Sequence, residues 1–286
     1  MKDFLKMTFA SIIGMMIAGF ILLILSISVI GGMVATTEVA TTVKDNSVFV
    51  LDLKGNIVER YEDNPIEQLL GEEITTRGLD DILSSIKKAK NDTKIRGILI
   101  NAETFACSTA SLQDIRDAIM DFKESGKFVV AYSGTYSQGA YYVSTAADKV
   151  FLNPYGSISW HGLSAQTMFL KDLLDKVGVK MQIFRVGTYK SAVEPFIATE
   201  MSDANREQTL AFTKSIWNEI VGEVSEARNI PTDKLNEMAD ACMDFQPAET
   251  YIENGMADKL MYKDEVLAYL KELTGTSEKS TLATLT

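Results

Sequence analysis

The feature that most constrains this 286-residue chain is an uncharged, apolar stretch near its N-terminus. No charged residue occurs between Met7 and Thr37, and residues 9–34 are predominantly apolar. A membrane-spanning helix needs about 20 apolar residues, whereas the apolar core of a cleaved signal peptide has about 7–15. We therefore expect residues 9–34 to form a transmembrane anchor.

The residues that flank this stretch predict its orientation. Lys2 and Lys6 lie on the short N-terminal flank, which the positive-inside rule places in the cytoplasm. We therefore expect residues 1–8 inside the cell and the body of the chain on the far side of the membrane. Residues 35–45 are mostly polar and predict a short tether between the two.

Charge and composition argue against several classes of function. The net charge is −11 and the body has no basic patch, so we do not expect a nucleic acid as the partner. There is no HExxH motif, no spaced Cys/His cluster and no P-loop, so we expect no metal site and no cofactor. We interpret Cys107 and Cys242 as two unpaired, partly buried thiols, with one disulfide as the alternative.

Short apolar runs alternate with amphipathic patterns along the body, which is typical of βα units and a mostly parallel sheet. We expect this α/β domain to cover residues 46–275 and a linker-like tail to cover residues 276–286. The predicted strands are residues 46–53, 95–101, 128–133, 149–152 and 181–186. The predicted helices are residues 79–90, 111–123, 140–147, 167–176 and 202–228. Ser202 is expected to be the N-cap of the last helix, and residues 245–260 predict a short helix, a stop at Gly255 and a small strand.

The chain has a single histidine, His161, and this limits the possible catalytic bases. His161 follows a predicted strand, and we interpret its ring as capping a turn rather than serving a Ser–His–Asp triad. A lysine can replace histidine as the general base if it is neutral near pH 7, which requires its pKa to fall by about 3 units. Lys190 is the best candidate because it follows a predicted strand and a glycine and has apolar neighbours. Its alternative role is a surface ion pair with Glu194.

A nucleophile is expected in a tight turn between a strand and a helix, where backbone N–H groups can also stabilise an oxyanion. Residues 136–142 (YSQGAYY) predict such a turn, and both Ser137 and Gln138 lie in it. Its alternative role is the N-cap of the helix that follows.

The segments YSQGAYY (residues 136–142) and RVGTYKSAVEPF (residues 185–196) resemble the signal peptide peptidase A family, specifically the N-terminal half of its long, two-repeat form. The resemblance covers about residues 1–275. It implies a ClpP/crotonase-like fold of stacked ββα units after one transmembrane helix. It also implies a serine-type endopeptidase of the bacterial inner membrane, with a Ser/Lys dyad and no cofactor, that degrades cleaved signal peptides as a homo-oligomer, by resemblance a tetramer. In the family a lysine at the position of Lys190 is the general base.

Two departures from the family pattern limit what this half can do. Gln138, not Ser137, aligns with the nucleophile, so Ser137 is an unfavoured candidate. Residues 102–109 (AETFACST) stand where the catalytic repeat has a Pro-Gly-Gly oxyanion loop. In the long form the serine comes from a second repeat. We therefore expect this chain to supply the base but not the nucleophile, and to be nearly inactive in isolation.

Two other functions compete with this one. An acyl-CoA hydratase or isomerase uses the crotonase version of the fold, but the anchor and the glycine-poor residues 102–109 argue against it. A non-catalytic scaffold half would tolerate replacement of Lys190. For a peptidase, we expect extended, apolar peptides that bind by strand pairing.

Overall fold

The computed structural model describes residues 1–35, 42–61 and 76–286, which form two units, residues 1–43 and 44–286. The first unit contains the helix α1 (Lys2–Ala35), which is about 50 Å long at the usual helical rise. By length and composition, residues 2–28 of this helix are a candidate membrane span. The helix begins before the predicted anchor and includes all of residues 9–34.

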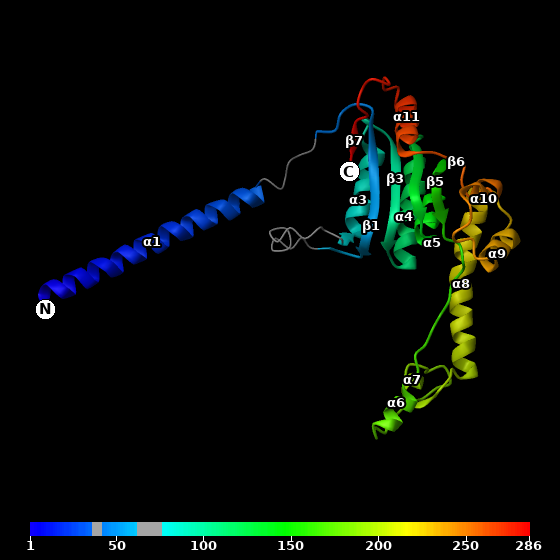
Figure 1. The fold of residues 1–286 in the computed structure, drawn as a ribbon, viewed down its shortest axis with the longest axis horizontal. Coiled ribbons are helices and arrows are strands. Elements are labelled where there is room, and N and C mark those ends of the chain that lie inside the picture. Colours follow the sequence, from blue (N-terminus) through cyan, green and yellow to red (C-terminus); the bar gives the residue numbers. More distant parts are fainter. Residues whose placement is uncertain (36–41, 62–75) are drawn as a thin grey trace. The chain divides into compact units, whose positions relative to one another are not determined.

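The second unit is built on a parallel sheet in the order β2-β1-β3-β4-β5-β6, with β7 also paired to β1 (Figure 1). Every strand pair is parallel. The strands are β1 (Ser47–Val58), β2 (Thr76–Gly78), β3 (Ile95–Ala106), β4 (Phe128–Tyr136), β5 (Lys149–Ile158), β6 (Lys259–Leu260) and β7 (Thr284–Leu285). The predicted mostly parallel α/β fold is confirmed.

The described helices of this unit connect the strands, and several of them cover the sheet. They are α3 (Leu79–Asn91), α4 (Thr109–Lys123), α5 (Gln138–Ser144), α6 (Lys171–Lys176), α7 (Glu194–Ile197), α8 (Asp203–Arg228), α9 (Thr232–Asp240), α10 (Ala248–Glu253) and α11 (Lys263–Thr274). On one face of the sheet, Leu99 packs in a cluster with Val266 and Leu270 of α11. Side chains alternate along a strand, so the fully buried Ile98 and Ile100 point to the opposite face, where α4 and α5 lie. Both faces are therefore covered, as a parallel sheet requires.

Several strands run further than their apolar patterns predict. β1, β3, β4 and β5 continue past the predicted ends, because β1 and β3 stay paired as far as Asn56 and Ala106, and β4 and β5 as far as Tyr136 and Ile158. Part of the tail expected to be a linker lies in the sheet: Leu282 is buried, and Thr284 and Leu285 pair with the start of β1.

The predicted strand at residues 181–186 is wrong. These residues have no regular secondary structure, and Met181, Phe184 and Val186 are exposed. A strand is stabilised by hydrogen bonds to a neighbour, and no described strand pairs with this segment. The predicted helix before it is also shorter, since α6 begins at Lys171.

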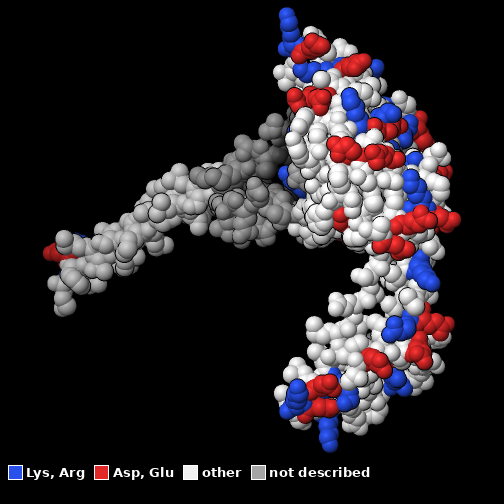
Figure 2. Space-filling view, turned by 45° about the vertical axis from the view of Figure 1, so that its right-hand side comes forward, with Lys and Arg blue, Asp and Glu red and all other residues white. Residues whose placement is uncertain are grey.

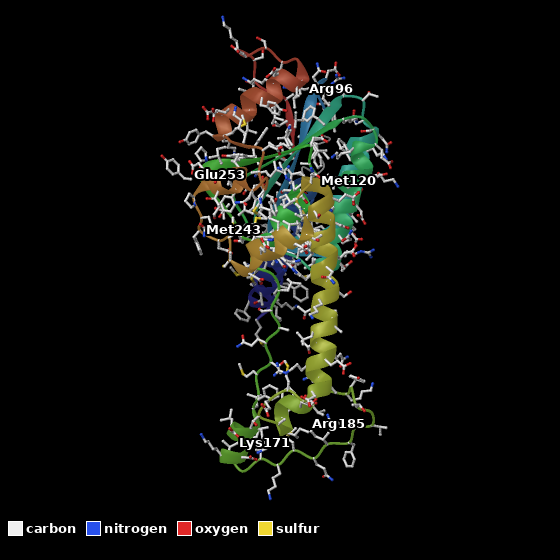
Figure 3. The ribbon with its side chains drawn as sticks, turned by 90° about the vertical axis from the view of Figure 1, so that its right-hand side faces the viewer. Arg96, Met120, Lys171, Arg185, Met243 and Glu253 are labelled. Carbon is white, nitrogen blue, oxygen red and sulfur yellow. The ribbon has the colours of Figure 1, made fainter. Side chains whose placement is uncertain are left out.

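Residues 163–202, which we call the arm, extend away from the sheet and return to it through the long helix α8 (Figures 1 and 3). Ser202 is the N-cap of α8, as predicted, and accepts a hydrogen bond from the backbone N–H of Asn205. Figure 2 shows that acidic and basic side chains are interspersed over the face drawn there.

Candidate functional site

A pocket of about 340 Å³ lies where β3 and β4 end and α4 and α5 begin. This is the edge of a parallel sheet where ligands usually bind. Its lining residues are Phe105, Ala106, Cys107, Thr109, Leu112, Ser137, Gln138, Gly139, Tyr142, Leu163 and Ile220. Within the described part of the chain, the pocket is thus lined by no histidine, lysine or carboxylate that would act as a base.

Ser137 lies in this pocket at the N-terminus of α5. Its hydroxyl oxygen accepts a hydrogen bond from the backbone N–H of Ala140 at 3.3 Å, which is the geometry of an N-cap. Capping by itself accounts for a serine at this turn, so its presence there is no evidence for a catalytic role.

Gln138, which follows it, is held by the loop that leads into the arm. Its Oε1 accepts hydrogen bonds from the backbone N–H groups of His161 and Gly162, each at 3.1 Å, and its Nε2 donates to the carbonyl of Gly162 at 3.0 Å. The His161 ring is exposed, and the contact of this residue to the site is through its backbone. A neutral amide held in this way is a structural link and not a nucleophile.

The segment aligned with the oxyanion loop is largely a strand. β3 continues through Ala106, and Phe105 and Ala106 pair with Gly55 and Asn56 of β1. Its backbone therefore belongs mainly to the sheet, which also disfavours the acyl-CoA reading. Cys107 and Cys242 are free, as predicted, although Cys242 is exposed rather than partly buried. Burial raises the pKa of the Cys107 thiol, so it is protonated at neutral pH and a weak nucleophile.

Lys190 does not line this pocket. It lies on the arm with its side chain exposed, and its backbone carbonyl accepts a hydrogen bond from the Arg185 guanidinium at 3.2 Å. Phe184 and Tyr189 beside it are also exposed, so the chain alone does not supply the apolar cleft that we expected. Among the described ion pairs, the carboxylate of Glu194 pairs with Arg185, whose Nη1 lies 3.6 Å from it, and not with Lys190.

Comparisons with known proteins identify the family. The model of "Peptidase family S49" matches residues 121–277, which include Ser137, Gln138 and Lys190. The chain belongs to peptidase family S49. This confirms the resemblance noted above and agrees with the ClpP/crotonase-like fold that it implies.

Individual relatives carry peptidase names. The chain is 35% identical over 226 residues to "Protease 4" of Haemophilus influenzae, covering 76% of this chain and 36% of that protein. It is 37% identical over 204 residues to "Protease 4" of Salmonella typhi, covering 68% and 33%. It is 27% identical over 243 residues to "Serine protease SPPA, chloroplastic" of Arabidopsis thaliana, covering 85% and 34%. The S49 chain thus spans about a third of the length of these relatives.

A buried polar network, which our reading of the sequence missed, joins the pocket wall of this S49 chain to α8. The guanidinium of Arg116 pairs with the carboxylate of Glu223 at 2.5 Å and donates to the hydroxyl of Thr145 at 2.9 Å. Gln113 donates to the same carboxylate at 2.6 Å, and the Tyr142 hydroxyl donates to it at 2.5 Å. One signal was available: Arg116 falls within the apolar stripe of its helix, next to Ile115.

The pKa shifts in this network fix the protonation states of its members at neutral pH. Burial raises the pKa of Glu223, but hydrogen bonds from Tyr142 and Gln113 and the charge of Arg116 outweigh it and hold that pKa below its ordinary value. Burial, together with the bond to Glu223, raises the pKa of Tyr142 far above its ordinary value. At neutral pH the carboxylate is therefore ionised and the phenol protonated, so the network holds helices together rather than moving protons.

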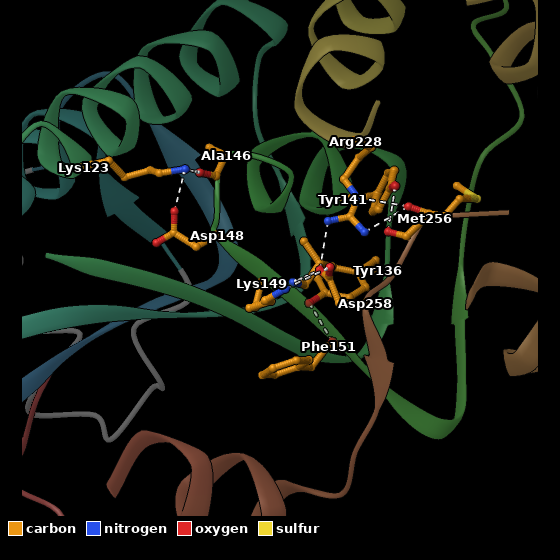
Figure 4. A network of polar contacts seen from close by, with 12 residues as sticks. Lys123, Tyr136, Tyr141, Ala146, Asp148, Lys149, Phe151, Arg228, Met256 and Asp258 are labelled. Carbon is orange, nitrogen blue, oxygen red and sulfur yellow. Dashed lines mark hydrogen bonds and ion pairs between the residues drawn. The ribbon is translucent and has the colours of Figure 1, made fainter. Parts of the chain in front are cut away.

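The C-terminal end of α8 is fixed by a second ion pair. Arg228 donates from Nε and Nη2 to the carbonyl of Gly255 at 3.1 and 2.9 Å, and its Nη1 lies 2.9 Å from the carboxylate of Asp258 (Figure 4). Asp258 also accepts a hydrogen bond from the backbone N–H of Val150 in β5 at 2.7 Å. The arm is therefore joined to the sheet through a helix that is anchored over its C-terminal half.

Proposed function

We propose that this S49 chain is the membrane-anchored, base-supplying part of a serine-type endopeptidase with a Ser/Lys dyad. Lys190 is its general base, and its substrates are peptides, in particular signal peptides left after secretion. The observation that carries the proposal is that the candidate general base and the pocket lie in different parts of the chain. Among the described residues, the lining of the pocket includes no base, and the candidate base lies exposed on the arm and is not part of that lining.

In this proposal a second repeat supplies the serine. The neutral Lys190 amine takes the proton of the serine hydroxyl, and the hydroxyl oxygen attacks the peptide carbonyl carbon. The resulting ammonium then gives its proton to the nitrogen of the leaving peptide, and water releases the acyl group in a second round of the same steps. Exposed Phe184, Val186 and Tyr189 support the idea that a partner surface covers the arm and excludes water there.

The same proposal includes the setting of the reaction. α1 anchors the chain in the bacterial inner membrane with its N-terminus in the cytoplasm, and the α/β unit lies on the periplasmic side. The active form is a homo-oligomer, by family resemblance a tetramer, and needs no cofactor. Lys2 and Lys6 at the N-terminus support this orientation.

The test is Lys190→Ala in the full-length natural protein, assayed in membranes with a peptide ester. Loss of the base is expected to lower kcat by about 10²–10⁴-fold. Lys180→Ala is the matched control, because Lys180 is another exposed lysine of the arm, and its kcat should be unchanged. Full activity of Lys190→Ala would rule out the proposed role.

The isolated 286-residue chain offers a second test. It should hydrolyse the ester no faster than a buffer blank, since the described residues that line its pocket include no base and no favoured nucleophile. Turnover that Ser137→Ala abolishes would instead identify Ser137 as the nucleophile.

One observation favours a second candidate function, a non-catalytic scaffold half. Gln138 takes the place of a nucleophile and is held at both ends of its amide by the backbone of residues 161–162. A scaffold of this kind would retain peptide cleavage in the assembled protein when Lys190 is replaced by alanine.

A further inference from the structure

The arm contains one strongly buried carboxylate. The side chain of Glu194 is 3% exposed, although most side chains around it on the arm are in solvent. A buried charge is costly unless it is paired and hydrogen-bonded. Its partners therefore indicate what it holds in place.

Those partners belong to the start of α8. Glu194 Oε1 accepts from the Ser202 hydroxyl at 2.6 Å, and Oε2 accepts from the Ser202 backbone N–H at 3.3 Å and from the Asn205 side-chain amide at 2.9 Å. A negative charge at the N-terminus of a helix is also stabilised by the helix dipole. These hydrogen bonds, that of the Ser202 hydroxyl first, hold the pKa of Glu194 below its ordinary value, so the group stays ionised at neutral pH.

Arg185 links this carboxylate to the Lys190 segment. Its Nη1 lies 3.6 Å from Glu194 Oε1 and also donates to the Lys190 carbonyl at 3.2 Å. Between the two residues, Gly187 has a φ of +106°, a conformation that favours glycine and turns the chain so that residue 190 returns to residue 185. Arg185 thus closes the loop of residues 185–190 and, through Glu194, links it to the N-terminus of α8.

We propose that Glu194 and Arg185 are positioning residues, which fix the Lys190 loop to the N-terminus of α8 and so set where the Lys190 amine stands. The inference rests on the proposed function, in which that amine is the general base. α8 is 26 residues long. Glu223 anchors its C-terminal half to α4 and α5, and Arg228 anchors its C-terminal end to the sheet through Asp258. The position of the base relative to the sheet is therefore set through α8.

This matters for catalysis because the base and the nucleophile come from different parts of the assembly. A displacement of about 1 Å in a reacting group can cost about 10²-fold in rate. An exposed loop without the Arg185 link would sample many positions of Lys190. The rate would fall while substrate binding, which other surfaces provide, would persist.

The test uses the full-length protein and two variants, Arg185→Ala and Glu194→Gln. Each is expected to lower kcat for a peptide ester by about tenfold or more with KM unchanged. The double variant should be no worse than the poorer single one, because both residues act through one link. Arg206→Ala and Glu200→Gln are matched controls, since both side chains are exposed on α8 and the arm, and their kcat should equal that of the wild type.

A second measurement does not depend on activity. A lysine-specific protease is added to the detergent-solubilised protein, and cleavage after Lys190 is followed by mass spectrometry. Arg185→Ala and Glu194→Gln should accelerate this cleavage, because the loop is released, whereas the two control variants should not.

The outcomes separate this inference from the proposed function. If Lys190→Ala abolishes turnover while Arg185→Ala leaves either kcat or cleavage after Lys190 unchanged, the inference is overturned and the proposed function stands. If Lys190→Ala keeps full turnover, the proposed function is overturned. Faster cleavage in the variants would then still support the loop attachment, and unchanged cleavage would overturn it.

Discussion

The sheet and the arm of this S49 chain are stabilised in different ways. In the sheet and the helices that cover it, apolar side chains such as Ile100 of β3 and Ile115 of α4 are completely buried. In the arm, Phe184 and Val186 are 88% and 90% exposed, and the ordered contacts are polar, centred on Glu194. The sheet is held by burial that the chain provides for itself. The arm is held by a few directional contacts, and its apolar side chains gain nothing until another surface covers them.

The largest expected effect is on the free energy of unfolding, when a buried apolar residue of the sheet is compared with an exposed one of the arm. Ile100→Ala should lower the free energy of unfolding by about 2–5 kcal/mol, because it leaves a cavity in the core. Phe184→Ala should change it by no more than about 0.5 kcal/mol in the isolated chain. Urea unfolding followed by the fluorescence of Trp160 and Trp217 measures both. A large loss for Phe184→Ala would show that the arm has a core of its own.

An intermediate effect is expected where the two regions meet. Arg116→Ala leaves the partly buried carboxylate of Glu223 without its charged partner and should destabilise the chain by about 1–3 kcal/mol. Replacing both residues, Arg116→Met with Glu223→Leu, should recover part of that loss, since no unpaired charge remains. Urea unfolding again reports the change. A double variant less stable than Arg116→Ala would contradict this account.

The smallest effect is local and depends on pH. The pKa of Glu194 is lowered in the folded chain, so its contribution to stability is present above its ordinary pKa of about 4.3 and is lost as pH falls through the lower, folded value. Glu194→Gln should therefore reduce hydrogen-exchange protection of the first amides of α8 at pH 7. The difference from the wild type should shrink below about pH 4.

Glu200→Gln is the control for this measurement, because its side chain is exposed and its protection should match the wild type at every pH. A loss of protection in Glu194→Gln that stays the same at low pH would mean that the charge of Glu194 has no part in capping α8.

Local patterns in the sequence predicted much of the sheet unit. The starts of β3, β4 and β5 at Ile95, Phe128 and Lys149 coincide with the predicted strands, and α8 begins after Ser202 as its N-cap pattern indicated. The apolar pattern of residues 181–186 predicted a strand for the same local reason and failed. A strand depends on a neighbour, and the described structure supplies none there.

The candidate site was predictable only in part. The turn that contains Ser137 and the importance of Lys190 in its segment were visible in the sequence. The network of Arg116 and Glu223 was not, because its members lie 107 positions apart and only the packing of α4 against α8 brings them together. The link from Glu194 through Arg185 was also hidden, since the sequence suggested Lys190 as the partner of that carboxylate.

The sequence by itself determined the apolar N-terminal helix, the parallel α/β class and the family, because each depends on composition, periodicity or short motifs within one segment. Only the tertiary structure decided which side chains meet. It placed Lys190 in solvent on the arm, put no base among the described residues that line the pocket, and enclosed Glu194 at the start of α8. The physical reason is that burial and ion pairing depend on the whole chain in three dimensions, whereas helix caps, turns and apolar repeats depend on near neighbours along it.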